Sequence, residues 1–162
     1  MVWNSQRHSA PDLLDGSEAA YPVKIINDPK KRGIGKAVLI VDGNAGIRKL
    51  LAVAFLSDGF KTCVQAENGK ESIEAAKQIK PDVITLDFSM PVMNGLEAAS
   101  KLRKLFPKTP IILFTLYADS LLRTEASKAG VSLVLLKTVP LPTLIDRAHE
   151  LMENYFSPLV VN

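Results

Sequence analysis

Four residues whose side chains can ionise, hold a metal ion or donate a hydrogen bond each end a short apolar segment. Asp42 ends AVLIVD, Asp87 ends DVITLD, Thr115 ends PIILFT and Lys137 ends VSLVLLK. An unpaired buried carboxylate is costly, so an acid at the end of a core segment is expected beside a cation or a reactive partner. Taken singly, each residue reads as a helix cap or a surface side chain. Their joint occurrence predicts one shared site.

The elements that would position this site alternate along the chain between strand and helix patterns. Uniformly apolar strands are buried on both faces, which predicts a parallel sheet covered by helices and joined by right-handed crossovers. The carboxyl ends of such strands meet at one edge, where function collects. The predicted strands are 37–41, 60–66, 82–87, 110–115 and 131–137.

Five helices are predicted between and after these strands. Asn44 resembles the N-cap of the first, which ends at Asp58-Gly59. Asn68-Gly69 opens the second and Pro81 stops it, and the others cover about 95–106, 118–129 and 141–155. The predicted inward faces are Ile47, Leu50, Leu51, Ala54 and Phe55; Ile73, Ala76 and Ile79; and Leu144, Ile145, Ala148, Leu151, Met152 and Tyr155.

The four residues at the strand ends suit phosphoryl transfer to a carboxylate. Asp87 is the candidate nucleophile, with a divalent ion neutralising the crowded negative charge. Thr115 could donate a hydrogen bond to one phosphoryl oxygen, and Lys137 could pair with another.

Composition narrows the class of protein. The 162 residues are 47% hydrophobic and 23% charged with a net charge of +3, too mild and scattered to indicate nucleic-acid binding. The single Cys63 excludes an internal disulfide and favours a reducing compartment. No secretory leader or membrane-length apolar run is present, so we expect a cytoplasmic protein. His8 and His149 have no neighbours that resemble metal ligands and are expected to face solvent.

The first part of the chain differs from the rest in composition and in its hydrophobic pattern. Residues 1–35 carry scattered Pro and Gly without a sustained period, which predicts a flexible N-terminal extension or linker. Residues 21–26, YPVKII, could instead pair as an extra edge strand. The domain itself is predicted over 36–156, followed by a short tail at 157–162.

The chain from about 37 to 155 resembles a response-regulator receiver domain of two-component signalling. The resemblance is carried by VLIVDGN and Arg48 (38–48), by DVITLDFSMPVMNG (82–95), and by Thr115 and Lys137, all in the family's order and spacing. It implies a flavodoxin-like, doubly wound (βα)5 sheet with strand order 2-1-3-4-5.

The resemblance also implies roles for these residues. Asp87 would accept a phosphoryl group from a histidine kinase or a phosphotransfer protein. Asp42, Asp87 and the backbone carbonyl of Ser89 would hold Mg²⁺, and Thr115 and Lys137 would sense the phosphoryl group. The domain would not be an enzyme; it would act on a downstream protein partner through its fourth and fifth helices and fifth strand, without binding nucleic acid or membrane. Homodimer formation stays open.

Four positions depart from the family pattern around this site. Gly43 stands where the family has a second acid that binds the metal, so we expect Mg²⁺ binding to be weakened. Leu116 replaces a small residue and could narrow the path to Asp87. Val134 replaces an aromatic switch residue, and Thr138 replaces a proline, so the Lys137–Thr138 peptide bond is expected to be trans.

These departures support an alternative in which the domain is a phosphorylation-independent interaction module. Two enzyme classes are disfavoured. A haloacid-dehalogenase-like phosphatase needs an acid at the position of Ser89, and a flavodoxin needs a Ser/Thr-rich phosphate loop in place of GNAGIR.

Overall fold

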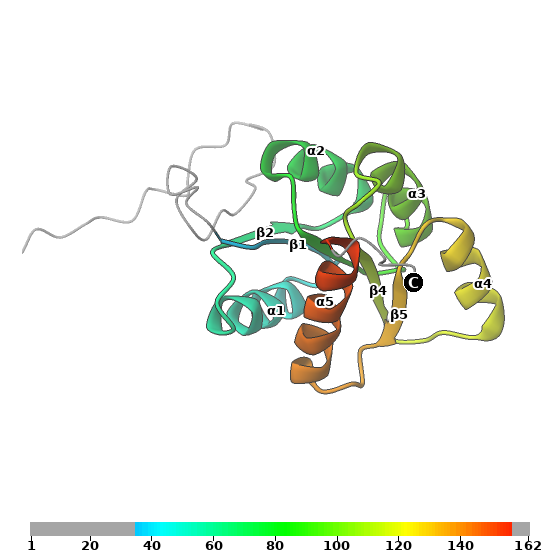
Figure 1. Cartoon of the computed structure of the whole chain (residues 1–162). Coiled ribbons are helices and arrows are strands. Elements are labelled where there is room, and N and C mark those ends of the chain that lie inside the picture. Colours follow the sequence, from blue (N-terminus) through cyan, green and yellow to red (C-terminus); the bar gives the residue numbers. More distant parts are fainter. Residues whose placement is uncertain (1–34, 157–162) are drawn as a thin grey trace, which may run out of the picture.

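The computed structural model describes residues 35–156, which form a five-stranded parallel sheet with helices on both faces (Figure 1). The strand order, β2-β1-β3-β4-β5, confirms the predicted topology. Predictions for 1–34 and 157–162, including the possible strand at 21–26 and the place of His8, lie outside the described residues. The elements are β1 (Ala37–Val41), α1 (Ala45–Ser57), β2 (Thr62–Ala66), α2 (Gly69–Ile79), β3 (Val83–Leu86), α3 (Gly95–Leu105), β4 (Ile111–Thr115), α4 (Ser120–Lys128), β5 (Leu133–Leu136) and α5 (Leu141–Phe156).

The sheet separates two apolar cores. Successive side chains of a strand point to opposite faces, so Val38 and Ile40 of β1 pack with α1 and α5, whereas Leu39 and Val41 pack with α2, α3 and α4. Every residue of β1, β3 and β4 is buried, as predicted for strands covered on both sides. The edge strand β5 is only half-buried along its length, which corrects that prediction for the last strand.

Four helices begin at the carboxyl edge of the sheet with a capping side chain. Asn44, Asn68, Asn94 and Asp119 each have extended backbone and accept a hydrogen bond from a first-turn N–H of α1, α2, α3 and α4. Such a cap contributes about 1 kcal/mol to helix stability. The predicted cap at Asn44 is therefore confirmed, and Asn68-Gly69 opens α2 as predicted.

Two strands end one residue before the site residue that was predicted to be their last. β3 ends at Leu86 and β5 at Leu136, so Asp87 and Lys137 leave the regular ladder. Each keeps one backbone hydrogen bond to a neighbouring strand: Asp87 N–H donates to the Val41 carbonyl at 2.8 Å and Lys137 N–H to the Thr115 carbonyl at 2.7 Å. Both side chains are thus held by fixed backbone at the strand ends.

Two predicted core residues are exposed. Leu50 in α1 is 56% exposed, because the buried face of that helix consists of Leu51, Ala52 and Phe55. Tyr155 in α5 is 40% exposed, and its hydroxyl lies 3.3 Å from that of Ser132.

His149 is partly buried, which corrects the prediction that it faces solvent. Its Nε2 lies 2.5 Å from Asp58 Oδ2, its Nδ1 lies 3.1 Å from the Lys36 ammonium, and its ring packs against Phe60. The side chain therefore links α5 to the end of α1 and the start of β1.

The amino edge of the sheet is held by Arg103 of α3. Its guanidinium donates two hydrogen bonds to the Gly130 carbonyl at 3.0 and 2.8 Å, and one each to the carbonyls of Pro107 and Thr109 at 2.9 Å. A further bond reaches Ser132 Oγ at 3.2 Å. One cation thus joins α3 to the segments that enter β4 and β5. No sequence motif predicted this role.

The single cysteine is a buried core residue. Cys63 is free, and burial raises the pKa of its thiol to about 12. Over residues 35–156, none of the helices combines the length and apolar character that a membrane span needs.

Candidate functional site

The structure brings the four predicted residues together at the carboxyl edge of the sheet. Asp42 follows β1, Asp87 follows β3, Thr115 ends β4 and Lys137 follows β5. Asp42, Asp87 and Thr115 are buried, at 2%, 8% and 4% exposure. Because the strands are parallel and adjacent in the order β1-β3-β4-β5, residues far apart in sequence become neighbours.

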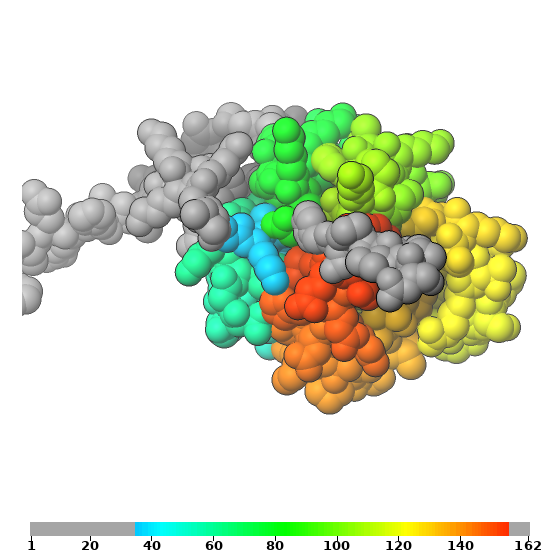
Figure 2. Space-filling view, in the orientation of Figure 1, coloured from blue at the N-terminus to red at the C-terminus, as the bar shows by residue number. Residues whose placement is uncertain are grey.

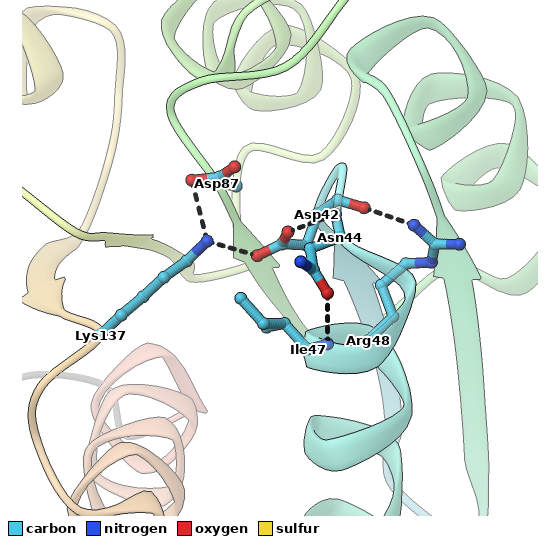
Figure 3. Close-up of polar contacts among 6 residues, drawn as sticks. All are labelled: Asp42, Asn44, Ile47, Arg48, Asp87 and Lys137. Carbon is cyan, nitrogen blue, oxygen red and sulfur yellow. Dashed lines mark hydrogen bonds and ion pairs between the residues drawn. The ribbon is translucent and has the colours of Figure 1, made fainter.

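Lys137 lies between the two carboxylates (Figure 3). Its Nζ is 2.7 Å from Asp42 Oδ2 and 3.2 Å from Asp87 Oδ1, and all three side chains are at most 10% exposed. Two acids this close repel each other, and the ammonium compensates part of that repulsion. The pair of contacts makes Lys137 the central cation of the site.

The environment of Asp87 keeps its carboxyl group basic. Burial raises the pKa of Asp87 above its ordinary value, and the negative charge of Asp42 raises it further. The Lys137 ammonium and a hydrogen bond from the backbone of Ser89 oppose that rise in pKa without cancelling it. A more basic carboxylate is a better nucleophile, provided that it is ionised when it reacts.

Asp42 is held in place by its own loop. Its Oδ1 accepts a hydrogen bond from Asn44 N–H at 2.8 Å, and its carbonyl accepts one from Arg48 Nη1 at 2.7 Å. The Asn44 side chain in turn accepts from Ile47 N–H at 3.1 Å, so Asn44 is a helix cap and no substitute for the missing acid (Figure 3). Arg48 belongs to the motif that carries the family resemblance, but its contact with Asp42 was not predicted.

Gly43 leaves room for a side chain. A Cβ atom built there would meet nothing closer than 3.9 Å, at Pro91 Cδ, which is an ordinary van der Waals contact. Crowding therefore does not explain why the second acid is absent.

The oxygen donors present fit Mg²⁺ in type but are few. Mg²⁺ is bound in proteins through one or two carboxylates and keeps several waters, and Asp42, Asp87 and the Ser89 carbonyl offer such donors. Within the described part of the chain, no three His, Cys, Asp or Glu side chains are grouped so as to hold a metal ion. Both Asp42 oxygens already accept contacts, from Lys137 and from Asn44. These observations favour weak Mg²⁺ binding.

The remaining atypical positions lie around the site. Leu116 is 73% exposed and lines a surface groove together with Ser89 and Thr115. Val134 is half-buried and packs with the core on the α2–α4 face. Thr138 is exposed, and its peptide bond to Lys137 is trans as expected, since no cis bond occurs in residues 35–156.

Comparisons with known proteins agree with this geometry. Residues 38–149 match the family model described as the response regulator receiver domain. The chain is 38% identical over 97 residues to the chemotaxis protein CheY of Thermotoga maritima, covering 60% of this chain and 81% of that protein.

Two solved structures show the same arrangement of elements. CheY4 of Vibrio cholerae superposes with a TM-score of 0.69 at 27% identity, covering 73% of this chain and 99% of that one. A CheY from Borrelia burgdorferi, in a complex with CheX, BeF3 and Mg²⁺, superposes with a TM-score of 0.68 at 26% identity, covering 73% and 90%.

Proposed function

Because the chain belongs to the response regulator receiver domain family, a family of signalling modules, we propose that Asp87 is its phosphoryl acceptor. The observation that carries this proposal is the position of Lys137, whose ammonium contacts both Asp87 and Asp42 inside a buried pocket. A carboxylate at a strand end, paired with a cation and close to a hydroxyl at Thr115, is the set that aspartyl phosphorylation needs.

The transfer itself exchanges one bond to phosphorus for another. An oxygen of the Asp87 carboxylate attacks the phosphorus of a phosphohistidine, the P–N bond breaks, and its electron pair returns to the imidazole nitrogen, which takes up a proton. Lys137 leaves one of its two carboxylate contacts and pairs with a phosphoryl oxygen. Thr115 donates its hydroxyl to another oxygen, which draws the end of β4 toward Asp87.

Asp42, Asp87 and the Ser89 carbonyl would hold Mg²⁺ during this step. The ion would supply positive charge to neutralise the phosphoryl oxygens. With Gly43 in place of a carboxylate, the site would bind Mg²⁺ weakly, and Lys137 would contribute a larger share of the positive charge.

The phosphoryl donor is a histidine kinase or a phosphotransfer protein in the cytoplasm, and the output is contact with a downstream protein. Residues 36–156 form the receiver, preceded by an extension over 1–35 and followed by a tail over 157–162. We propose that the domain acts as a signalling module and not as an enzyme.

Intact-mass measurement after incubation with phosphoramidate or acetyl phosphate and Mg²⁺ tests the proposal. We expect one added phosphoryl group on the wild-type protein and none on Asp87→Ala. Asp82→Ala is a matched control, because Asp82 lies at the other end of β3, where its carboxylate accepts from Ala37 N–H. No adduct on wild type with any phosphodonor would refute the acceptor role.

A second function is favoured by Gly43 together with the contacts of Lys137. Two carboxylates bridged by an ammonium form a site that is partly neutralised without a metal, as expected of an interaction module that does not depend on phosphorylation. In that case the two-dimensional NMR spectrum would be unchanged by phosphodonor and Mg²⁺. Shifts spreading from Asp87 to α4 on adding phosphoramidate would eliminate this alternative.

A further inference from the structure

A groove beside the acceptor site exposes large apolar side chains. Its volume is about 510 Å³. Leu116, Tyr117 and Leu121 stand 73%, 69% and 67% exposed along it. The charged side chains that line it, Asp119 and Glu125, are both acidic. Isolated exposed apolar residues are common on proteins, but a cluster of this kind indicates a contact surface.

A second groove of about 680 Å³ continues the first between α3 and α4. The two share Leu96 and Glu125, so they form one depression, here called the α3–α4 trench. The two helices adjoin at the right of the molecule (Figure 2). The second groove is lined by Lys101, Lys104 and Lys128 in addition to Glu97 and Glu125. The trench is therefore apolar and acidic near Asp87 and richer in lysine at the far end.

Val92 at the edge of the second groove has an unfavourable backbone conformation. Its φ is +69°, in the left-handed region, and its side chain is 77% exposed. A β-branched residue there costs roughly 1–2 kcal/mol, which glycine would avoid. Because the Val92 side chain is exposed, its burial within the domain does not offset this backbone cost. Its position on the trench offers a use for it, since a docked partner would bury it.

The shape of the trench favours a helix as its occupant. A small molecule binds where the protein encloses most of its surface, whereas Leu116, Tyr117 and Leu121 project into solvent. The walls are helices α3 and α4 and, in the first groove, the segments that follow β3 and β4. No residue of the edge strand β5 lines either groove, so a peptide strand has no strand edge there to pair with. α3 has 11 residues, so a helix lying along it would contact roughly 16 Å of trench, which is about three turns.

We propose that the α3–α4 trench binds an amphipathic helix of a partner protein, with Lys or Arg at one end and Asp or Glu at the other. The basic end would lie beside Asp119, because Glu125 is already paired with Lys128 at 3.0 Å, and the acidic end would lie beside Lys101 and Lys104. Leu116, Tyr117, Leu121 and Val92 would contact its apolar face. This surface lies on the opposite face of the sheet from α5 and differs from the α4–β5–α5 surface that the family resemblance implied.

The trench and the acceptor site share two residues. Ser89 lines the first groove and its backbone forms a hydrogen bond with Asp87, and Thr115 lines the same groove from the end of β4, the strand next to β3. A helix docked there would therefore be sensitive to movement of Thr115. Docking itself requires no phosphoryl group, so this inference stands or fails separately from the proposed function.

A synthetic helix tests the proposal on the full-length, unmodified protein. The probe is a peptide of about 18 residues, long enough to be helical in isolation, with one Leu-rich face, Lys in one half and Glu in the other. The control peptide has the same composition with Lys and Glu mixed along its length. We expect the first to bind about tenfold tighter, from several exposed charge pairs acting together. Methyl NMR shifts should change at Leu96, Leu116 and Leu121.

Two variants define the site, with one matched control. Leu121→Glu should abolish binding, and the double variant Lys101→Glu/Lys104→Glu should remove the preference for the first peptide. Leu50→Glu, which changes an exposed leucine of α1 outside the trench, should bind as wild type.

Four results would overturn the proposal, and three of them come from the peptide titration. These are no saturable binding up to about 1 mM peptide, equal affinity for both peptides, or shifts confined to another face. A concentration-dependent dimer in sedimentation that disappears in Leu121→Glu would also overturn it, by assigning the trench to a second copy of the chain.

Discussion

Each edge of the sheet has a central cation, and the two cations are bound in different ways. At the amino edge, Arg103 donates to four backbone carbonyls and a hydroxyl at 2.8–3.4 Å. At the carboxyl edge, Lys137 contacts only the carboxylates of Asp42 and Asp87 among the side chains described. Backbone carbonyls are neither protonated near neutral pH nor phosphorylated, so the hydrogen-bond acceptors of Arg103 stay the same. Carboxylates can be protonated, phosphorylated or bound to a metal, so the partners of Lys137 can change.

The comparison of the two edges shows that the unfavourable buried charge is confined to the edge that carries the acceptor site. The Arg103 edge joins three helix and strand ends through neutral acceptors, which costs little desolvation for each bond formed. The Lys137 edge buries two negative charges for one positive charge, and the raised pKa of Asp87 records the imbalance. Four substitutions distinguish a fixed edge from a switchable one.

The largest effect is expected at the fixed edge. Arg103→Leu should lower the free energy of unfolding by roughly 3 kcal/mol, because several carbonyls lose a charged donor. Urea denaturation followed by circular dichroism measures it, and the loss should not depend on pH near neutrality. Arg103→Lys should recover only part of it, since an ammonium lacks the planar fork. A loss below about 1 kcal/mol would mean that water replaces the guanidinium.

The effect of removing the Lys137 ammonium on stability should depend on whether Asp87 is charged. Lys137→Met should lower the free energy of unfolding by roughly 2 kcal/mol near neutral pH, because two buried carboxylates lose their counter-charge. In the Asp87→Asn background the same substitution should cost much less. A double-mutant cycle measures this coupling. Equal costs in both backgrounds would show that Lys137 stabilises the fold through packing alone.

Placing an acid at position 43 should increase the affinity of the site for Mg²⁺. Gly43→Asp should tighten Mg²⁺ binding by about tenfold, because it adds a direct carboxylate ligand where a Cβ has space. NMR titration with MgCl₂ gives the dissociation constant, and Gly43→Asn controls for the added volume without the added charge. Tightening in the Asn variant alone would point to loop ordering instead of charge.

The smallest effect is a gain in stability. Asp87→Asn should raise the free energy of unfolding near neutral pH by about 1 kcal/mol, because it removes a buried negative charge beside Asp42. Residues required for function are often unfavourable for stability in this way. Because the folded state raises the pKa of Asp87, the folded wild type holds its proton to higher pH than the unfolded chain. Wild-type stability from this group is therefore fully present at low pH and is lost as pH rises through the raised pKa.

That linkage gives the Asp87→Asn prediction a pH dependence. The advantage of the Asn variant should shrink as pH falls toward the ordinary pKa of aspartate and vanish below it. Thermal melts of both proteins across pH check the sign. An advantage that grows on acidification would mean that Lys137 outweighs burial and Asp42.

Sequence reasoning predicted what depends on local pattern and strand topology. Apolar runs located all five strands, and parallel order then placed Asp42, Asp87, Thr115 and Lys137 at one edge. The four strands other than β1 were predicted one or two residues too long at one or both ends, because residues that adjoin the apolar runs, most of them polar, were counted with the strand.

Features set by long-range geometry could not be predicted in the same way. Arg103 bonds carbonyls up to 27 residues away, and nothing in its local sequence distinguishes it from Lys101 or Lys104. Leu50 fits a helical apolar stripe but lies just outside the arc that α1 buries. The pairing of His149 with Asp58 spans 91 residues and appears only once α5 packs beside α1.

The inertness of Cys63 has a practical value for studying this molecule. A buried thiol with a pKa of about 12 stays protonated and shielded, so it should ignore maleimide reagents in the native state. Any cysteine introduced at an exposed position, such as Tyr117→Cys or Leu50→Cys, would then be the sole labelling site. Fluorophores and spin labels could be attached without first replacing Cys63, so the packing of the core would be unchanged.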